Sequence, residues 1–299
     1  MIQPPARTPD RTLYISDLDG TLLQPDATLS EQARSLLTEL LESGTQFTIA
    51  TARSIVSVRH ILRGLPIRLP VICANGAYLS DLETGRHRAV QALAPELAQE
   101  VFGCIGAHGL LGFLSAYDGE ADYLYFGREL NEPMTWYVED RFRQGDDRPR
   151  QVEDFSEAFG QQLISFNLID RLAPLQALEH DLNIRFSGRL QMYYYENWYN
   201  PEWFWLSIFD HQATKAGGIG VLLAETGLAP ADVTVFGDSL NDESMFRMAG
   251  RRVAVANAKP EIKALADEVI GSNETDSVIE YLAKATGRAW TETPRRSAP

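Results

Sequence analysis

The chain has 299 residues, 44% of them hydrophobic, and a formal net charge of −14. This acidity argues against a nucleic-acid or anionic-membrane partner, because both bind a basic face. No stretch approaches the length of apolar sequence that a membrane helix needs, so the sequence predicts no membrane span.

The two cysteines, Cys73 and Cys104, are too few for a disulfide framework, and a reducing cytoplasm is the expected location. Residues 1–10 are rich in proline and lack the apolar stretch of a signal peptide. We expect a flexible arm there.

The first third of the chain alternates predicted strands with predicted helices. Short apolar runs indicate the strands, and apolar side chains at a 3.6-residue period indicate the helices. In chain order we expect a strand over 13–15, a helix over 30–43, a strand over 47–50, a helix over 54–63 and a strand over 70–74. This alternation predicts a parallel sheet.

The middle of the chain, from about residue 82 to 210, has a different pattern. Its predicted strands are longer and more aromatic, and they alternate with a period of two. The expected strands are 123–126, 163–168, 190–195 and 203–209, with helices at 95–102 and 173–181 between them. The change predicts an α+β domain inserted into an α/β domain.

The last third returns to the first pattern. We expect a helix after Lys215, a strand over 233–236, a helix over 241–249, a strand over 252–256 and a helix that opens at Pro260.

Two acidic motifs each follow a predicted buried strand of the core. They are Asp17-Leu18-Asp19-Gly20-Thr21 and Gly237-Asp238-Ser239-Leu240-Asn241-Asp242. Ligands of an open parallel sheet bind beyond the carboxyl ends of its strands, so these four carboxylates can meet in one crevice. At 4 Å and an effective dielectric constant near 20, each pair would repel by roughly 4 kcal/mol. The motifs therefore predict a hard cation such as Mg²⁺ and an anionic substrate that shares it.

Four groups of residues, in this order, resemble the motifs of the haloacid dehalogenase superfamily of phosphatases. They are the two acidic motifs, Thr51-Ala52-Arg53 after a predicted strand, and Lys215 at the start of a helix. The Asn75-Gly76-Ala77 turn, the inserted α+β segment and the run Val253-Ala254-Val255-Ala256-Asn257-Ala258 are similar to the Cof-type branch, the sugar-phosphate phosphatases of subfamily IIB.

The resemblance implies an α/β fold in which a Rossmann-like parallel-sheet core carries an inserted α+β cap. The core is expected over 11–82 and 211–285. The cap, which would close over the site and select the substrate, is expected over 83–210. The arm over 1–10 and a flexible tail over 286–299 flank these domains.

The same resemblance implies the catalytic roles. Asp17 is the nucleophile that forms an aspartyl-phosphate, and Asp19 protonates the leaving alcohol and then activates water. Mg²⁺ would be held by the Asp17 carboxylate, the backbone carbonyl of Asp19 and Asp238. Asp242 would bond a water of the metal or a neighbouring ligand.

The resemblance also implies a set of residues that contact the phosphate or the substrate. They are Leu18, Thr51, Ala52, Arg53, Asn75, Lys215 and Asn241. Structural alternatives remain open, because Thr51, Asn241 and Asp242 are residue types that cap helices and Arg53 could form a surface salt bridge. The helix dipole disfavours a cation at a helix start by about 0.3–1 kcal/mol, so the position of Lys215 indicates a charge-clamping role.

The chain departs from the family pattern in two places. Ala216 follows the lysine where glycine is usual, and Gly217, Gly218 and Gly220 then crowd one helix, so we expect close backbone packing there. Thr275-Asp276-Ser277 stands where Asp-Gly is common, which we expect to change a surface turn and not the chemistry.

Two further features support less specific predictions. His211 lies near Lys215 in the sequence, and we favour a structural role for it over substrate contact. The aromatic-rich stretch 192–205, which includes Trp198, Tyr199 and Trp203, is expected to pack in a core or at a subunit contact. Stacking on a sugar ring is the alternative.

We therefore expect a cytoplasmic, Mg²⁺-dependent phosphatase of small phosphomonoesters, with sugar phosphates as the favoured substrates. A hexose phosphomutase of the same superfamily is the alternative enzyme, and a phosphosugar-binding regulator is the alternative without catalysis. The expected partner is a small phosphorylated metabolite, with no nucleic acid and no membrane, for a chain that is a monomer or a homodimer.

Overall fold

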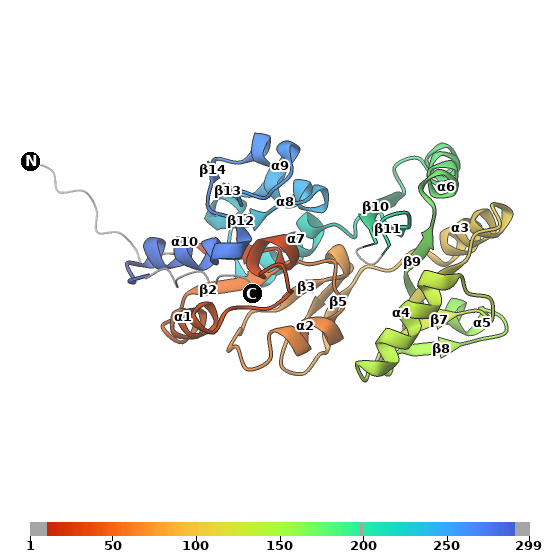
Figure 1. Cartoon of the computed structure of the whole chain (residues 1–299), viewed down its shortest axis with the longest axis horizontal. Coiled ribbons are helices and arrows are strands. Elements are labelled where there is room, and N and C mark those ends of the chain that lie inside the picture. Colours follow the sequence, from red (N-terminus) through yellow and green to blue (C-terminus); the bar gives the residue numbers. More distant parts are fainter. Residues whose placement is uncertain (1–10, 198–199, 291–299) are drawn as a thin grey trace, which may run out of the picture. The chain divides into compact units, whose positions relative to one another are not determined.

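The computed structural model describes residues 11–197 and 200–290, which form two compact units (Figure 1). The chain up to Ala89 and from Thr214 onward makes the first unit, and Val90–Ala213 makes the second. The first boundary lies a few residues beyond the expected 82, because the segment 78–89 continues the first unit, and the second lies shortly beyond the expected 210. The expected arm 1–10, residues 291–299 of the expected tail, and Trp198 and Tyr199 lie outside the described residues.

A parallel sheet forms the centre of the first unit, as the alternating pattern predicts. Its strands in spatial order are β14 (Glu268–Val269), β13 (Arg251–Ala254), β12 (Val233–Gly237), β1 (Leu13–Ser16) and β2 (Gln46–Ile49). A bridge between Ala50 and Ile72 links β2 to β3 (Val71–Cys73). β3 then forms a smaller sheet with β4 (Tyr78–Ser80) and β5 (His87–Val90).

The helices of the first unit bury one face each. They are α1 (Glu31–Glu42), α2 (Ile55–Ile61), α7 (Lys215–Thr226), α8 (Glu243–Met248), α9 (Pro260–Leu265) and α10 (Ser277–Thr286). In α1, the Ser30 hydroxyl caps the N-terminus by accepting from the Ala33 N–H, and the leucines at the 3.6-residue period are buried. Burying one leucine contributes about 1.5–3 kcal/mol, so this face determines how α1 packs.

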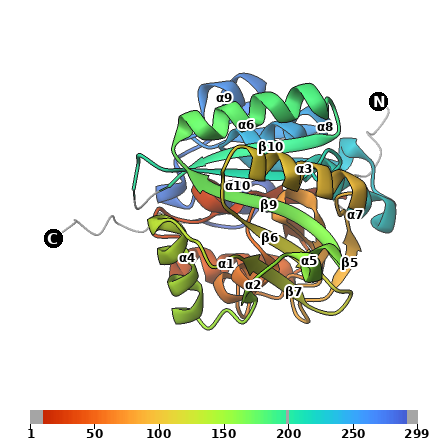
Figure 2. The ribbon, with the colours of Figure 1, turned by 90° about the vertical axis from the view of Figure 1, so that its right-hand side faces the viewer.

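The second unit is built on a six-stranded sheet. The spatial order is β10 (Leu190–Glu196), β11 (Phe204–Asp210), β9 (Gln162–Asp170), β6 (Gly112–Tyr117), β7 (Asp122–Phe126) and β8 (Pro149–Gln151). Neighbours are antiparallel except β7 and β8. α3 (Pro95–Ala107), α5 (Ser156–Phe159) and α6 (Leu172–Arg185) pack on one face, where Figure 2 shows α3 and α6 over the strands. α4 (Glu132–Arg143) packs on the other face.

Several elements differ from those expected. β6, β8 and α4 were not predicted, although β6 lies inside the sheet between β9 and β7. The helix expected over 241–249 is instead a 3₁₀ turn, Leu240–Asp242, followed by α8. Within the described ranges, no helix has both the length and the apolar character that a bilayer span requires.

Candidate active site

The two acidic motifs leave the central sheet at the same edge. β1 and β12 are parallel neighbours with Ser16 opposite Phe236, and the Asp17 N–H donates to the Phe236 carbonyl at 2.9 Å. The chain turns sharply after each strand, so Asp17 and Asp238 face one another across the strand ends. All predicted site residues, from Asp17 to Asp242, belong to the first unit.

Lys215 is the buried centre of this cluster. Its side chain is fully buried at the N-terminus of α7, and its Nζ lies 2.6 Å from Asp17 Oδ1 and 2.5 Å from Asp242 Oδ1. Burial alone would lower the pKa of Lys215, but the two carboxylates more than offset that effect and hold the pKa above its ordinary value. The ammonium is therefore charged, and it neutralises carboxylates that would otherwise repel one another.

The aspartates of the cluster are strongly perturbed. Burial raises the pKa of Asp17 well above its ordinary value; Lys215 opposes that rise, and the neighbouring carboxylates add to it. Burial and the Asp242 charge raise the pKa of Asp238 to about 6. Crowded carboxylates of this kind are more stable with a cation among them, because the cation favours their ionised form.

The donor set suits a hard divalent cation. Asp17, Asp238 and Asp242 each offer a carboxylate oxygen, and the three oxygens lie within 4.8 Å of one another. Asp238 Oδ1 accepts from the Thr21 hydroxyl at 2.8 Å. Gly20 makes room for Asp238: its φ is 76°, and a Cβ there would come within 2.7 Å of Asp238 Oδ2. Oxygen ligands and close packing fit Mg²⁺.

Asp242 accepts hydrogen bonds on both of its carboxylate oxygens. Its Oδ1 accepts from Lys215, and its Oδ2 accepts from the backbone N–H groups of Asp238 and Ser239, both at 2.9 Å. It thus both binds the lysine and caps the turn that presents Asp238. The capping alternative is therefore realised in Asp242, and it is compatible with the expected site role.

Asp19 lies outside the three-carboxylate group and pairs with Arg53. Arg53 Nε donates to Asp19 Oδ2 and Nη2 donates to Asp19 Oδ1, both at 2.7 Å. The side chains remain accessible, at 46% exposure for Asp19 and 29% for Arg53. The salt-bridge alternative for Arg53 is therefore realised, with a site aspartate as its partner.

Thr51, Asn75 and Asn241 are buried and are linked to one another by hydrogen bonds. Thr51 is fully buried, its hydroxyl accepts from the Arg53 N–H at 3.2 Å, and its carbonyl accepts from the Asn75 N–H at 2.9 Å. Asn241 Nδ2 donates to Asn75 Oδ1 at 3.1 Å. Ser54, and not Thr51, is the N-cap of α2. The Leu18 side chain is buried, so only its backbone could reach a ligand.

Two asparagines that support the first motif were not predicted as site residues. Asn257 Nδ2 donates to the Gly20 carbonyl at 2.7 Å, and Asn257 Oδ1 accepts from the Asn273 N–H. Asn273 Nδ2 donates to the Leu23 carbonyl at 2.8 Å. Together they hold the loop that carries Asp19. Asn257 lies in the run that pointed to the Cof-type branch, whereas Asn273 stood in no motif.

The late departure from the family pattern is only partly at the surface, since Thr275 is exposed but the two residues after it are not. Asp276 and Ser277 are buried, and Asp276 accepts from the Ser30 hydroxyl at 2.7 Å and from Gln24 at 3.2 Å. The residue therefore ties the start of α10 to the loop before α1. Its φ of 53° explains why glycine-like sequences suit this segment.

Other expectations have mixed outcomes. A Cβ on Gly218 would lie 2.5 Å from Ile72, so the predicted close packing exists there, but a Cβ on Gly220 would meet nothing. His211 lies 3.4 Å from Asp210. In the aromatic stretch, Tyr194 packs against the hydrophobic cluster under α3 and α6, and Trp205 packs against the cluster under α4. Both contacts agree with the expected core packing.

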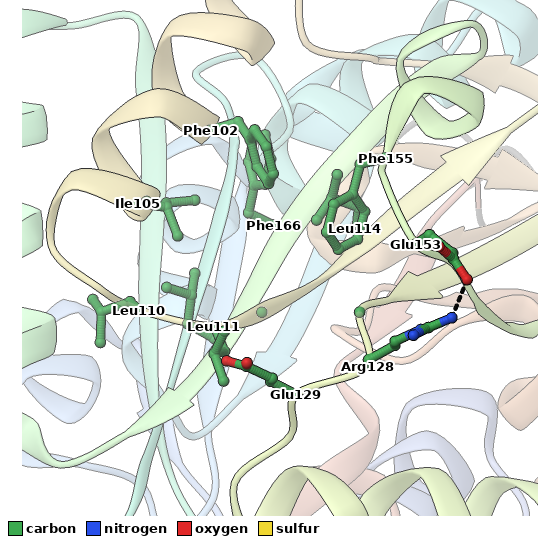
Figure 3. Close-up of a pocket in the computed structure, with 14 residues that line it drawn as sticks. Phe102, Ile105, Leu110, Leu111, Leu114, Arg128, Glu129, Glu153, Phe155 and Phe166 are labelled. Carbon is green, nitrogen blue, oxygen red and sulfur yellow. Dashed lines mark hydrogen bonds and ion pairs between the residues drawn. The ribbon is translucent and has the colours of Figure 1, made fainter.

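A cavity of about 360 Å³ lies within the second unit (Figure 3). Phe102, Phe155 and Phe166 line its apolar wall, and Arg128 and Glu153 pair at its rim. It contains none of the predicted site residues. The chemistry of the acidic cluster, and not the size of a cavity, therefore locates the candidate active site.

Sequence similarity to known proteins extends over most of this chain. Residues 14–282 match the family model of haloacid dehalogenase-like hydrolases. The chain is 28% identical to the pyridoxal phosphate phosphatase YbhA of Escherichia coli (strain K12), over 89% of this chain and 95% of that protein.

Solved structures resemble this chain over most of its length. The crystal structure of TM0651 from Thermotoga maritima has a TM-score of 0.73 at 26% identity and covers 91% of this chain and 97% of that one. The subclass IIB sugar phosphatase BT4131 has a TM-score of 0.70 at 21% identity, over 92% and 99% of the two chains, which shows a shared fold.

Proposed function

Because the chain belongs to the haloacid dehalogenase-like hydrolases, we propose that this phosphatase hydrolyses small phosphomonoesters through a phosphoryl group carried on Asp17. The observation that carries the proposal is the setting of Asp17. It is 5% exposed at the end of β1, with Lys215 on one oxygen and the Asp238 carboxylate nearby. A buried carboxylate costs desolvation free energy, and a fixed cation beside it prepares it for reaction.

In the first half-reaction, an Asp17 oxygen attacks phosphorus in line with the ester oxygen. The bond from phosphorus to the ester oxygen breaks, and the alcohol leaves with a proton from Asp19. Asp19 suits this role because it is two residues from Asp17 and its carboxylate is accessible. Lys215 keeps its contact with Asp17 and offsets the negative charge that gathers there.

In the second half-reaction, water attacks phosphorus of the aspartyl-phosphate. Asp19 accepts the proton of that water, the bond from phosphorus to Asp17 breaks, and inorganic phosphate leaves. The buried hydroxyl of Thr51 and the amides of Asn75 and Asn241, which are linked by a hydrogen bond, would hold the phosphoryl oxygens. The support for this step is their shared position at the strand ends.

Asp17, Asp238 and the backbone carbonyl of Asp19 would hold Mg²⁺, with Asp242 orienting the Asp238 turn. Bound there, Mg²⁺ would neutralise the carboxylates and the transferring phosphoryl group. The formal charges support this assignment: four aspartates against Lys215 and Arg53 leave a charge of −2, equal and opposite to one divalent cation.

Sugar phosphates remain the proposed substrate class, and the similarity to a pyridoxal phosphate phosphatase adds pyridoxal phosphate as a candidate. Both are small phosphomonoesters, so one assay covers them. Phosphate release is measured over hexose phosphates, pentose phosphates, nucleotides and pyridoxal phosphate, with Mg²⁺ or with a chelator.

The expected result is Mg²⁺-dependent phosphate release that Asp17→Asn abolishes. An isomerised sugar phosphate without free phosphate would indicate a phosphomutase instead. No product over the whole panel would favour a phosphosugar-binding regulator. Full turnover by Asp17→Asn would overturn the assignment of the nucleophile.

A further inference from the structure

The ion pair of Asp19 and Arg53 differs from the contacts of Lys215 in its exposure. Asp19 and Arg53 are 46% and 29% exposed, whereas Lys215 and Asp242 have no exposed side-chain surface. An exposed ion pair contributes little to stability because water competes with it. The Asp19–Arg53 pair can therefore break and re-form during turnover at a lower free-energy cost than the buried Lys215 contacts.

Arg53 is anchored so that one edge of its guanidinium can change partner. Nη1 donates to the Ser57 hydroxyl at 2.9 Å, while Nε and Nη2 point to Asp19. Its backbone is held at both ends, since its N–H donates to Thr51 Oγ1 and its carbonyl accepts from the Ala74 N–H. The guanidinium group thus has a fixed position. Its edge formed by Nε and Nη2, here called the exchangeable edge, can change partner.

In the proposed function, this edge of Arg53 would lie beside the phosphoryl group. Asp19 is two residues from Asp17, and Thr51 and Ala52 directly precede Arg53. A guanidinium fork matches two oxygens of a phosphoryl group as well as it matches a carboxylate, and the phosphoryl group carries more charge. A bound phosphomonoester is therefore a stronger partner for this edge than exposed Asp19.

We infer that Arg53 exchanges Asp19 for the substrate's phosphoryl oxygens, and that this exchange frees the Asp19 carboxylate to meet the leaving-group oxygen. The inference rests on the proposed function, in which Asp19 serves the leaving group. Before substrate binds, the fork occupies both Asp19 oxygens. Once the phosphoryl group takes the fork, Asp19 can take up a proton from solvent water and rotate toward the ester oxygen, to which it then gives that proton. Substrate binding itself therefore completes the site.

The test compares Arg53→Gln, Arg53→Lys and the unmodified protein with Mg²⁺ and the best substrate of the panel. Arg53→Gln should raise KM and the inhibition constant of inorganic phosphate together, by about tenfold to a hundredfold, because a charged hydrogen-bonding partner of the phosphoryl group is lost. The kcat of Arg53→Gln should change little, because Asp19 no longer has an arginine partner from which it must be released. Arg53→Lys should fall between, and added guanidinium ion should restore the Arg53→Gln KM.

Arg68→Gln is the matched control, because it removes an exposed arginine of the same unit outside the site. It should leave KM, kcat and phosphate affinity unchanged. Circular dichroism establishes that each variant is folded.

Two results would overturn the exchange. A fall in kcat with unchanged KM would mean that Arg53 only positions Asp19. Unchanged KM, kcat and phosphate affinity would mean that the pair is a surface salt bridge. Calorimetric binding of inorganic phosphate to Asp17→Asn, with and without Arg53→Gln, tests the exchange without turnover. Failure of the proposed function, seen as full activity in Asp17→Asn, is thereby distinguished from failure of the exchange.

Discussion

The aspartates of the first motif lie two residues apart, and their surroundings differ in a way that fits the two roles proposed for them. Asp17 is buried against Lys215, whereas Asp19 is accessible and bonded to Arg53. A fixed, desolvated carboxylate suits attack on phosphorus, and an accessible one suits proton transfer to a leaving group. Gly20, with its left-handed φ, makes the turn that follows both aspartates.

Asp19→Asn should separate proton transfer from metal binding. The amide cannot give or take the proton, so turnover should fall about 10²–10⁴-fold. The proposed metal ligand at this position is the backbone carbonyl, so Mg²⁺ should still raise the melting temperature as it does for the unmodified protein. Thermal shift with and without Mg²⁺, beside kcat, measures both. Loss of the Mg²⁺ effect with near-normal kcat would reverse the assignment.

Lys215→Met should cost both stability and activity. The substitution leaves Asp17 and Asp242 buried without their cation, and removing one partner of a buried ion pair costs about 3–5 kcal/mol. Urea unfolding measures the loss, and Mg²⁺ should recover part of it.

Lys284→Met is the control for this prediction. Lys284 is 72% exposed and pairs with Glu280 on the surface of α10. The change should alter the free energy of unfolding by less than about 1 kcal/mol. Equal losses for the two lysine variants would contradict the clamping role of Lys215.

At the scale of elements, α7 shows how glycine acts in opposite ways within one helix. Gly218 is buried against Ile72 and the turn at Gly76, while Gly220 is exposed. Both lack the backbone restriction that alanine would supply in a helix, which is worth up to about 1 kcal/mol. Only Gly218 has a packing reason to be glycine.

The two glycines therefore predict opposite outcomes. Gly220→Ala should raise the free energy of unfolding by about 0.5–1 kcal/mol, through helix propensity alone. Gly218→Ala should lower it by about 1–3 kcal/mol, because the new Cβ would lie 2.5 Å from a buried Ile72 methyl group and force α7 away from β3. Denaturant unfolding measures both variants, and each serves as the control for the other. A loss of stability in Gly220→Ala would mean that a side chain at position 220 disrupts a contact of α7.

The elements also show which parts of the fold could be predicted from sequence. α1 and the strands before each acidic motif have strong periodicity and clear ends, and they lie where expected. β6 was missed because Gly112, Ser115 and Ala116 dilute its pattern, although its two neighbours bury it. α4 was missed because its Pro133 reads as a helix breaker, whereas proline is tolerated in a first turn.

The same reasoning applies to the site. The clustering of Asp17, Asp238 and Lys215 was predictable, because each stands at an element boundary where its residue type is unusual or costly. Asn273 was not, since its role depends on a hydrogen bond to Leu23 across 250 residues of sequence. The pairing of Asp19 with Arg53 could not be predicted either, because the order of the motifs in the sequence does not determine which of their side chains pair.

At the scale of the whole molecule, two units with separate cores need not unfold together. Ion pairs confined to the second unit should then affect its transition alone. Asp146 and Arg148 form such a pair, with Arg148 donating to both Asp146 oxygens from a largely buried position. Burial alone would raise the pKa of Asp146, but the hydrogen bonds and charge of Arg148 lower it overall.

The pH dependence of Asp146→Asn follows from this lowered pKa. The ionised carboxylate stabilises the folded state above its unfolded pKa near 4, and that contribution is lost as pH falls toward the lower folded pKa. At pH 7 the substitution should cost about 1–3 kcal/mol. The difference from the unmodified protein should shrink steadily below about pH 4.

Scanning calorimetry between pH 3 and pH 7 checks this prediction. Only the transition of the second unit should move. A substitution effect that stays constant over this range would mean that the Asp146 charge is not what stabilises the unit.

The insertion of the second unit between β5 and α7 also has a consequence for the order of events on the ribosome. Asp17 and Lys215 are 198 positions apart, and β1 has β12 as a neighbour on one side. At about 5–20 residues per second, the nascent chain exposes β1 for roughly 10–40 seconds before Lys215 and β12 are made. Val90–Ala213 is one continuous stretch, so it can fold during that interval. The acidic site is therefore among the last parts of the molecule to form, and a truncated translation product has no means of assembling it.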